Sequence, residues 1–286
     1  MLKTLRMMCA LACGLAVPGL HAASSIDDPH LWLEEVEGEK PLAWVKEQNA
    51  VSTRELEAHP AFSKIQDRLL EIMDSNERIP AVTKHGDFYY NFWRDAKNVR
   101  GLWRRTTLAE YRKPEPAWET VLDLDDLAKK ENENWVFKGA SILEPTDDRA
   151  LLRLSRGGAD ASVVREFDLQ SKQFVPEGFQ LPEAKSDTAW KDRDTLYLGT
   201  DFGPGSLTKS GYPRVVKEWR RGTPLAEANV VFEGKEEDVG VGPHVVRDHG
   251  RVYEFIGRAV TFFTSEMLLR QGGEWVLIDK PADAEL

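Results

Sequence analysis

The spacing of hydrophobic and polar positions changes near Pro80. Before this residue, apolar side chains recur every three or four positions, most regularly over residues 62–73, which is the spacing of one helix face. Asp28 and Pro29 supply the capping residue and the first-turn proline typical of a helix start. We therefore expect a short α-helical N-terminal segment over residues 24–80.

After Pro80 the chain consists of short apolar or alternating runs separated by turn residues, a pattern typical of antiparallel strands. The runs cover residues 88–93, 101–106, 118–123, 150–154, 163–167, 195–198, 214–219, 230–232, 252–256, 260–263 and 275–278. Units of strand, turn and strand repeat about every 50 residues, beginning near residues 84, 136, 186 and 239, a period typical of propeller blades. The pattern predicts a mainly β fold with a partial β-propeller over residues 81–286, and a β-sandwich or a twisted stack of hairpins is the alternative.

Residues 1–23 have the plan of a secretory signal peptide. Lys3 and Arg6 form a basic start, an uncharged apolar run covers residues 7–17, and small residues follow up to Ala23. We predict cleavage of this segment and export of the protein, to the periplasm or the medium.

Two membrane-bound alternatives are weaker. The apolar run is shorter than the ~20 residues that a helix needs to cross a bilayer. A lipid anchor at Cys13 would lack the usual Leu three positions earlier. Cys9 and Cys13 are the only cysteines, so the exported chain would contain no disulfide and no thiolate metal site.

Composition narrows the function classes. The 286 residues carry a formal net charge of −10, which disfavours a nucleic-acid partner, and 9% are aromatic, which disfavours disorder. A mean hydropathy of −0.46 excludes a protein with many membrane spans. After signal cleavage we expect no membrane association.

Residues 203–210 imitate two catalytic motifs. They nearly spell a phosphate-binding P-loop, but Thr208 stands where the second Gly is needed, and Pro213 soon after cannot continue a helix. Ser206 and Lys209 form an S-x-x-K pattern, yet no K-T-G follows. We interpret this stretch as a turn-rich loop between strands.

Metal-binding patterns are also incomplete. His244 and His249 bracket Asp248 at a spacing that suits a strand and a turn better than a metal site on a helix. The acidic run of Asp123, Asp125 and Asp126 lacks the rest of a calcium loop and is typical of a helix start or a turn. The other candidates, His30, His59 and His85, are isolated.

The chain contains no G-x-S-x-G nucleophile elbow, the motif that exposes the serine of α/β-hydrolases. With the incomplete motifs above, this predicts no catalytic, no cofactor-binding and no metal-binding residue in the chain. No cofactor is expected.

Several stretches resemble the prolyl oligopeptidase family. The run from Asp28 to Glu34 looks like the family's D-P-Y-x-W-L-E opening. Further similar stretches are Trp44-Val45 with Gln48-Asn49, residues 88–94 with 101–105, the S-x-G-G-x-D-like turn at 155–160, and residues 190–196 with 210–214. Together these stretches span nearly all of residues 27–286.

The resemblance implies a serine peptidase that cleaves short peptides, typically after proline. It implies a helical segment, a seven-bladed propeller that covers the active site, and an α/β-hydrolase domain that carries the whole Ser, Asp and His triad. The chain would then hold about four of the seven blades, and its partners would be the peptide substrate and the missing hydrolase domain.

We therefore expect the N-terminal propeller portion of an exported prolyl-oligopeptidase-like enzyme, which gates substrate access and is inactive alone. A frameshift, a premature stop or an incomplete gene model would explain the missing catalytic part. The alternatives are a free-standing β-propeller-like binding module without catalysis, and a chain that pairs with a separately encoded hydrolase half.

Overall fold

The computed structural model describes residues 28–35 and 37–284. The chain divides into two compact units, Met1–Arg68 and Leu69–Leu286, which are described separately. The predicted signal peptide, residues 1–23, lies outside the described residues. Among the residues described, no helix combines the length and the apolar character needed to cross a membrane.

The helical segment contains the 3-10 helix η1 (Leu31–Glu34) and the α-helices α1 (Glu39–Glu57) and α2 (Phe62–Asp74), which crosses the boundary between the units. Trp32 fixes the turn before α1, because its Nε1 donates a hydrogen bond to the Pro29 carbonyl at 3.0 Å. Its ring meets the ring of Trp44 edge-on, with centroids 6.0 Å apart. The prediction of N-terminal helices is confirmed.

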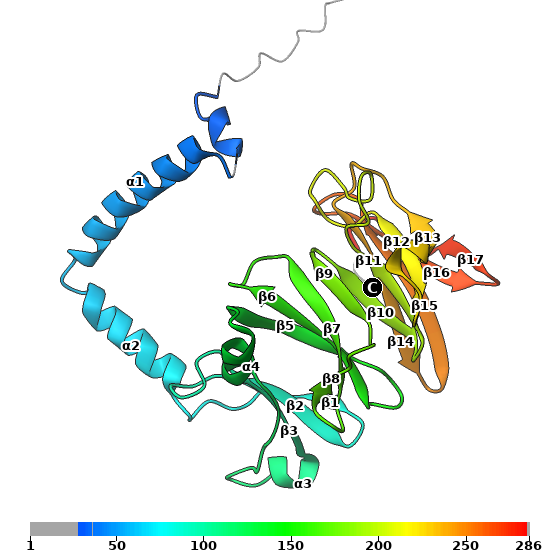
Figure 1. Ribbon diagram of the computed structural model, residues 1–286, viewed down its shortest axis with the longest axis horizontal. Helices are drawn as coiled ribbons and strands as arrows, with labels where there is room; N and C mark the ends of the chain where they lie inside the picture. The colour runs from blue at the N-terminus through cyan, green and yellow to red at the C-terminus, as the bar shows by residue number, and fades with distance from the viewer. Residues whose placement is uncertain (1–27, 36, 285–286) are drawn as a thin grey trace, which may run out of the picture. The chain divides into compact units, whose positions relative to one another are not determined.

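Four antiparallel sheets follow in chain order (Figure 1). The first contains β1 (Thr83–His85), β2 (Phe88–Trp93), β3 (Leu102–Thr107) and β4 (Glu119–Asp123). The second contains β5 (Trp135–Ile142), β6 (Arg149–Arg156), β7 (Ser162–Asp168), β8 (Gln173–Phe174) and β9 (Gln180–Ala184). The third contains β10 (Asp187–Asp192), β11 (Thr195–Gly199), β12 (Val215–Arg220) and β13 (Asn229–Glu233), and the fourth β14 (Gly240–Asp248), β15 (Arg251–Ala259), β16 (Ser265–Gln271) and β17 (Glu274–Leu277).

The sheets are the predicted repeat units. They open at Thr83, Trp135, Asp187 and Gly240, each within one residue of the expected starts. Three short helices lie between strands: α3 (Leu108–Tyr111), α4 (Leu124–Glu131) and the 3-10 helix η2 (Leu225–Glu227). The predicted fold class, a mainly β propeller of four blades after a helical segment, is confirmed.

Apolar faces hold the first two sheets together. Trp103 of β3 lies edge-on to Phe167 of β7, with centroids 6.3 Å apart, and both side chains are buried. Helix α4 adds a second cluster, in which Leu124 packs with Trp135 and Leu154. Each sheet thus buries on its neighbour the apolar surface that it could not bury alone.

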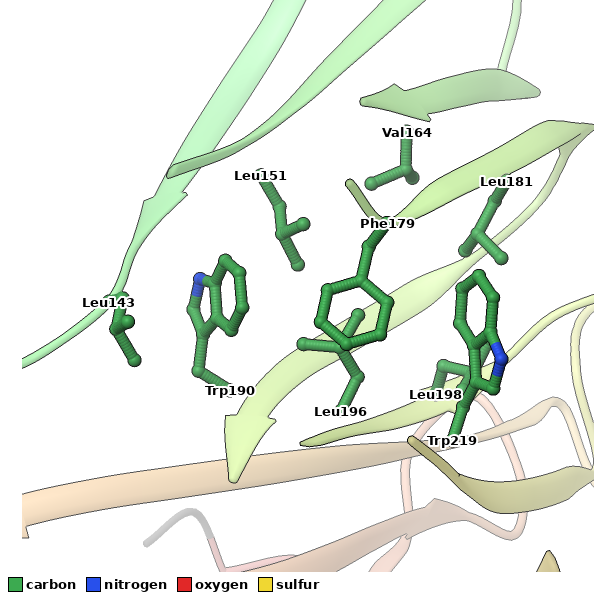
Figure 2. Packing of buried hydrophobic residues seen from close by; sticks show 9 residues of the cluster. All are labelled: Leu143, Leu151, Val164, Phe179, Leu181, Trp190, Leu196, Leu198 and Trp219. Atoms are coloured by element: carbon green, nitrogen blue, oxygen red, sulfur yellow. The ribbon is translucent and has the colours of Figure 1, made fainter. Parts of the chain in front are cut away.

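The second and third sheets share the cluster drawn in Figure 2, in which Phe179 lies between two indoles. Its ring centroid stands 5.8 Å from that of Trp190 and 5.0 Å from that of Trp219, both in edge-on contacts. Trp190 also donates from Nε1 to the Ser141 carbonyl at 2.9 Å, which connects β10 directly to β5.

A buried ion pair joins the same two sheets. Glu166 of β7 is 1% exposed and accepts both Nη groups of Arg221, at 2.8 and 3.1 Å. Its carboxylate also accepts the backbone amide of Phe179 at 2.9 Å. Two charge-assisted bonds and one amide bond therefore satisfy a carboxylate that would otherwise be costly to bury.

One predicted strand is wrong. Residues 260–263, expected to be a strand, form the turn between β15 and β16, and Phe262 and Phe263 are 84% and 80% exposed. The turn closes through a backbone bond from Val260 to the Thr264 carbonyl at 3.0 Å and a bond between the hydroxyls of Thr261 and Thr264. Apolar composition cannot distinguish an exposed turn from a strand, because turn geometry here depends on these hydrogen bonds.

We expect Arg221→Met to lower the free energy of unfolding by about 3–5 kcal/mol, because it leaves the Glu166 carboxylate buried without its main cation. Urea denaturation measures this loss. Arg193→Met is the matched control, since Arg193 is 44% exposed in its pair with Asp148 and should cost less than about 1 kcal/mol. Equal losses in the two variants would contradict the assigned role of Glu166.

A second ion pair makes stability depend on pH. Burial by itself would raise the pKa of Asp238, but two hydrogen bonds from Arg258, at 2.7 and 2.9 Å, and one from the Lys235 amide hold this pKa below its usual range. A lowered carboxyl pKa gives stability that is complete above the unfolded-chain value, about 3.9, and is lost as pH falls through the folded-state value.

Asp238→Asn should therefore destabilise the chain by about 2 kcal/mol at pH 7. The difference between wild type and variant should shrink as pH falls from about 5 to about 2. Urea midpoints measured across this range test the effect, and a difference that does not change with pH would contradict it.

Candidate functional site

The first strand of each sheet, β1, β5, β10 or β14, is an edge strand. A cavity of about 400 Å³ is lined by residues 140–142 of β5, 188–190 of β10 and 243–247 of β14, together with His85 at the end of β1. Strands from all four sheets therefore border one shared space.

A second cavity, of about 440 Å³, continues this space at the ends of the first strands. His85, Glu144 and Arg247 line both cavities. Two connections complete its wall: residues 144–147, which follow β5, and residues 249–250, which join β14 to β15. We call the two cavities together the channel, and the second cavity alone the channel mouth.

Hydrogen bonds fix the polar wall of the channel. Both Nη groups of Arg247 donate to the Trp190 carbonyl at 3.2 Å, and one also donates to the Lys191 carbonyl at 2.5 Å. These bonds tie β14 to β10. The Arg247 guanidinium is thus occupied by backbone acceptors, which restricts its freedom to bind a ligand.

An ionisable carboxylate stands near the opposite end of the first strands. Asp187 begins β10 and approaches β14 so closely that a Cβ on Gly242 would lie 3.1 Å from its Oδ2. Burial among the surrounding protein atoms raises the pKa of Asp187, and the charges of Arg153 and His244 oppose this rise. Charged groups therefore lie near both ends of the first strands.

The stretch that imitates a P-loop lies in the loop between β11 and β12, as predicted. Ser206 is 6% exposed, and its Oγ donates to the Gly203 carbonyl at 2.7 Å and accepts the Phe202 amide at 2.9 Å. Lys209 points outward to Glu237, at 3.3 Å. Ser206 and Lys209 are therefore not arranged as a nucleophile and its base.

The histidine and aspartate patterns also have structural roles. His244 lies in β14, whereas His249 lies in the following turn, 91% exposed and 2.7 Å from Asp248. Asp123 caps α4 by accepting the amides of Asp125 and Asp126 at 2.9 and 3.0 Å. In the described part of the chain, no group of three or more suitable side chains could hold a metal ion.

The sequence did not indicate the residues that line the channel mouth. His85 looked isolated, and Glu144 and Asp147 belong to no motif, yet all three line one cavity. The repeat could have indicated these residues, because the residues that follow the first strand of each repeat unit lie at the same end of a propeller.

Comparisons with known proteins assign the chain and its fold to a family. Residues 16–269 match the sequence model described as "Prolyl oligopeptidase, N-terminal beta-propeller domain". The chain therefore belongs to the prolyl oligopeptidase family, and its sheets are blades of the N-terminal propeller.

Two curated relatives are uncharacterized peptidases. The chain is 40% identical over 256 residues to y4nA of Sinorhizobium fredii, covering 88% of the chain and 35% of that protein. It is 33% identical over 219 residues to RP174 of Rickettsia prowazekii, covering 73% of the chain and 30% of that protein. The chain thus spans about a third of the length of these relatives.

Solved structures agree with this placement. A post-proline cleaving enzyme from Rickettsia typhi matches with a TM-score of 0.79 and 29% identity, over 88% of this chain and 38% of the enzyme. A prolyl endopeptidase structure matches with a TM-score of 0.70 over 94% of this chain and 40% of its own, and its 16% identity shows the fold alone.

Proposed function

We propose that this chain is the substrate-gating propeller of a serine peptidase that acts on short proline-containing peptides. The observation that carries the proposal is the family match over residues 16–269, on a fold whose first strands border one channel. The 29% identical enzyme from Rickettsia typhi, a post-proline cleaving enzyme, supports the substrate class.

The bond-cleaving groups then lie on polypeptide other than residues 1–286. The chain has no nucleophile elbow, and the only S-x-x-K candidate, Ser206, is bonded within its own loop. The role of the chain is to admit short, flexible peptides and to exclude large proteins, because a channel between packed sheets cannot widen without breaking their cores.

The fourth sheet supports packing against further polypeptide. Ile256 and Leu268 face the third sheet, so Phe255 and Leu269, their neighbours in the strands, face the opposite side. Phe255 pairs with Leu269, and Leu269 pairs with Val276, which makes an apolar row across three strands. An apolar face of this kind favours a part of a larger enzyme over a free-standing binding module.

We also propose that the protein is exported, on the basis of residues 1–23. A host cell that expresses the gene should yield, in its periplasm or medium, a protein that begins near residue 23 or 24. Amino-terminal sequencing measures this, and a mature protein that still begins at Met1 would reject export by this route.

A hybrid peptidase tests the gating role. Residues 28–284 would replace the matching part of the Sinorhizobium fredii relative, and a small proline ester would report an intact catalytic domain. We expect cleavage of a short proline-containing peptide and no cleavage of an unfolded protein of domain size. Equal cleavage of both substrates would reject the proposed gate.

Two matched substitutions place the gate in the channel. Val246 lines the channel and is 48% exposed. Val230 in β13 is matched to it in size and exposure, at 52%, but is not among the residues that line the channel. In the hybrid, Val246→Trp should lower kcat/KM for the peptide several-fold, without changing that for the ester, because it narrows the channel. Val230→Trp should change neither value, and identical behaviour of the two variants would place the entry route elsewhere.

A further inference from the structure

The channel edge of β14 carries backbone groups that β15 does not use. In an antiparallel pair, every second residue exchanges hydrogen bonds with the partner strand, and the residues between them point their N–H and C=O groups to the other edge. β14 lies at the edge of the fourth sheet, with β15 as its neighbour, so its second edge faces out of the sheet. Residues 243–247 of this strand line the channel.

The turn after β14 shows which of its residues bond to β15. The two turn residues, His249 and Gly250, have positive φ of 48° and 76°, which is the signature of a type I′ turn. In such a hairpin the flanking residues, here Asp248 and Arg251, exchange hydrogen bonds, and the pairing runs back to Gly240 without a bulge. Because hydrogen-bonded positions alternate along a strand, the even-numbered residues of β14 bond to β15.

Two odd-numbered residues support this assignment. Val241 donates its backbone N–H to the Pro213 carbonyl at 2.8 Å, away from β15. Position 243 is a proline, which has no N–H and is tolerated in a strand only where no ladder hydrogen bond is needed. The next odd-numbered residues, Val245 and Arg247, therefore point their backbone N–H and C=O groups to the channel edge.

Carbonyls on the neighbouring edges of β5 and β10 already have partners. The Ser141 carbonyl accepts the Trp190 indole. The carbonyls of Trp190 and Lys191 accept the Arg247 guanidinium. By contrast, nothing among the described residues bonds to the outward N–H or C=O of Val245. The channel edge of β14 therefore keeps one donor and one acceptor free at this residue.

The main chain of an extended peptide matches these groups. A carboxylate supplies only acceptors and an ammonium only donors, whereas a peptide supplies both in the alternation of a β-strand. The channel continues from residues 243–247 to its mouth beyond the end of β14, so a peptide that follows it runs beside this strand. The cavity of about 400 Å³ admits a single chain but not the edge of another protein's sheet.

We infer that β14 binds an extended peptide as an added strand along its channel edge, through the N–H and C=O of Val245, the N–H of Arg247 and the C=O of Pro243. This inference rests on the proposed function, because it says where a peptide lies inside the channel. Main-chain hydrogen bonds do not depend on side chains, so this edge accepts different sequences. A proline in the peptide fits wherever its missing N–H would point away from β14.

Calorimetric titration of the 286-residue chain with a peptide and its ester analogue tests the inference. The probes are N-acetyl-Ala-Ala-Pro-Ala-Ala amide and the same molecule with lactic acid in place of each alanine, which keeps the shape and removes the N–H donors. We expect the ester to bind at least about tenfold more weakly, because it cannot donate to the carbonyls of β14.

Two reciprocal substitutions locate the site. Val245→Pro removes the N–H at the channel edge without breaking a bond to β15, and it should weaken binding of the amide peptide about three- to tenfold. Pro243→Ala adds an N–H to the same edge, and it should strengthen binding by a similar factor. Damage to the fold cannot produce tighter binding, so Pro243→Ala tests the inference even where Val245→Pro fails to fold.

Leu277→Pro is the matched control on the outer edge of β17. The turn before β17, Gly272–Gly273, has positive φ of 58° and 93°, so Gln271 and Glu274 are its hydrogen-bonded pair. By the same alternation, Leu277 points its N–H away from β16. Leu277 is not among the residues that line the channel, so this variant should leave the affinity unchanged.

Equal affinity for the amide and ester peptides, absence of binding by the amide peptide, or equal weakening by Val245→Pro and Leu277→Pro would overturn the inference. So would a Pro243→Ala chain that binds no more tightly than wild type. The proposed gating function fails separately, when the hybrid peptidase cleaves unfolded protein as fast as short peptide. A chain that shows the expected binding pattern but does not gate would retain this strand-addition site and lose only the gating function.

Discussion

Sheet-on-sheet burial is the constraint on which the rest of the propeller depends. A four-stranded sheet cannot bury both of its faces by itself, so each blade is stable only against its neighbours. The second and third blades meet this need through the edge-on contacts of Phe179 with Trp190 and Trp219. The Glu166–Arg221 pair lies beside these rings and fixes the two sheets in one alignment.

The channel follows from this packing. Once the apolar faces are matched, the first strands come together, and their polar groups must find partners there. The Arg247 guanidinium donates to the carbonyls of Trp190 and Lys191, and the Trp190 indole donates to the carbonyl of Ser141. Among the described residues, the buried acceptors His85 Nδ1 and Asp147 Oδ1 form no hydrogen bond.

The roughly 50-residue repeat, the N-terminal helices and most of the strands could be predicted from the sequence. The spacing of apolar residues and the enrichment in β-branched side chains reflect the local backbone conformation. The turn at Val260–Thr264 could not be predicted, since its geometry depends on the hydroxyl bond between Thr261 and Thr264. The channel mouth also could not be predicted from spacing. His85 and Asp147 are about 60 residues apart in the sequence, and only the closure of the first blade on the second brings them to one cavity.

We propose that the chain controls access to a peptidase and carries no nucleophile of its own. A fluorophosphonate that reacts with activated serines tests this most directly, when applied to the purified 286-residue chain and to its Sinorhizobium fredii relative side by side. We expect a labelled relative and an unlabelled chain, with no hydrolysis of a proline-containing peptide by the chain. A labelled serine in the chain, together with peptide hydrolysis, would contradict it.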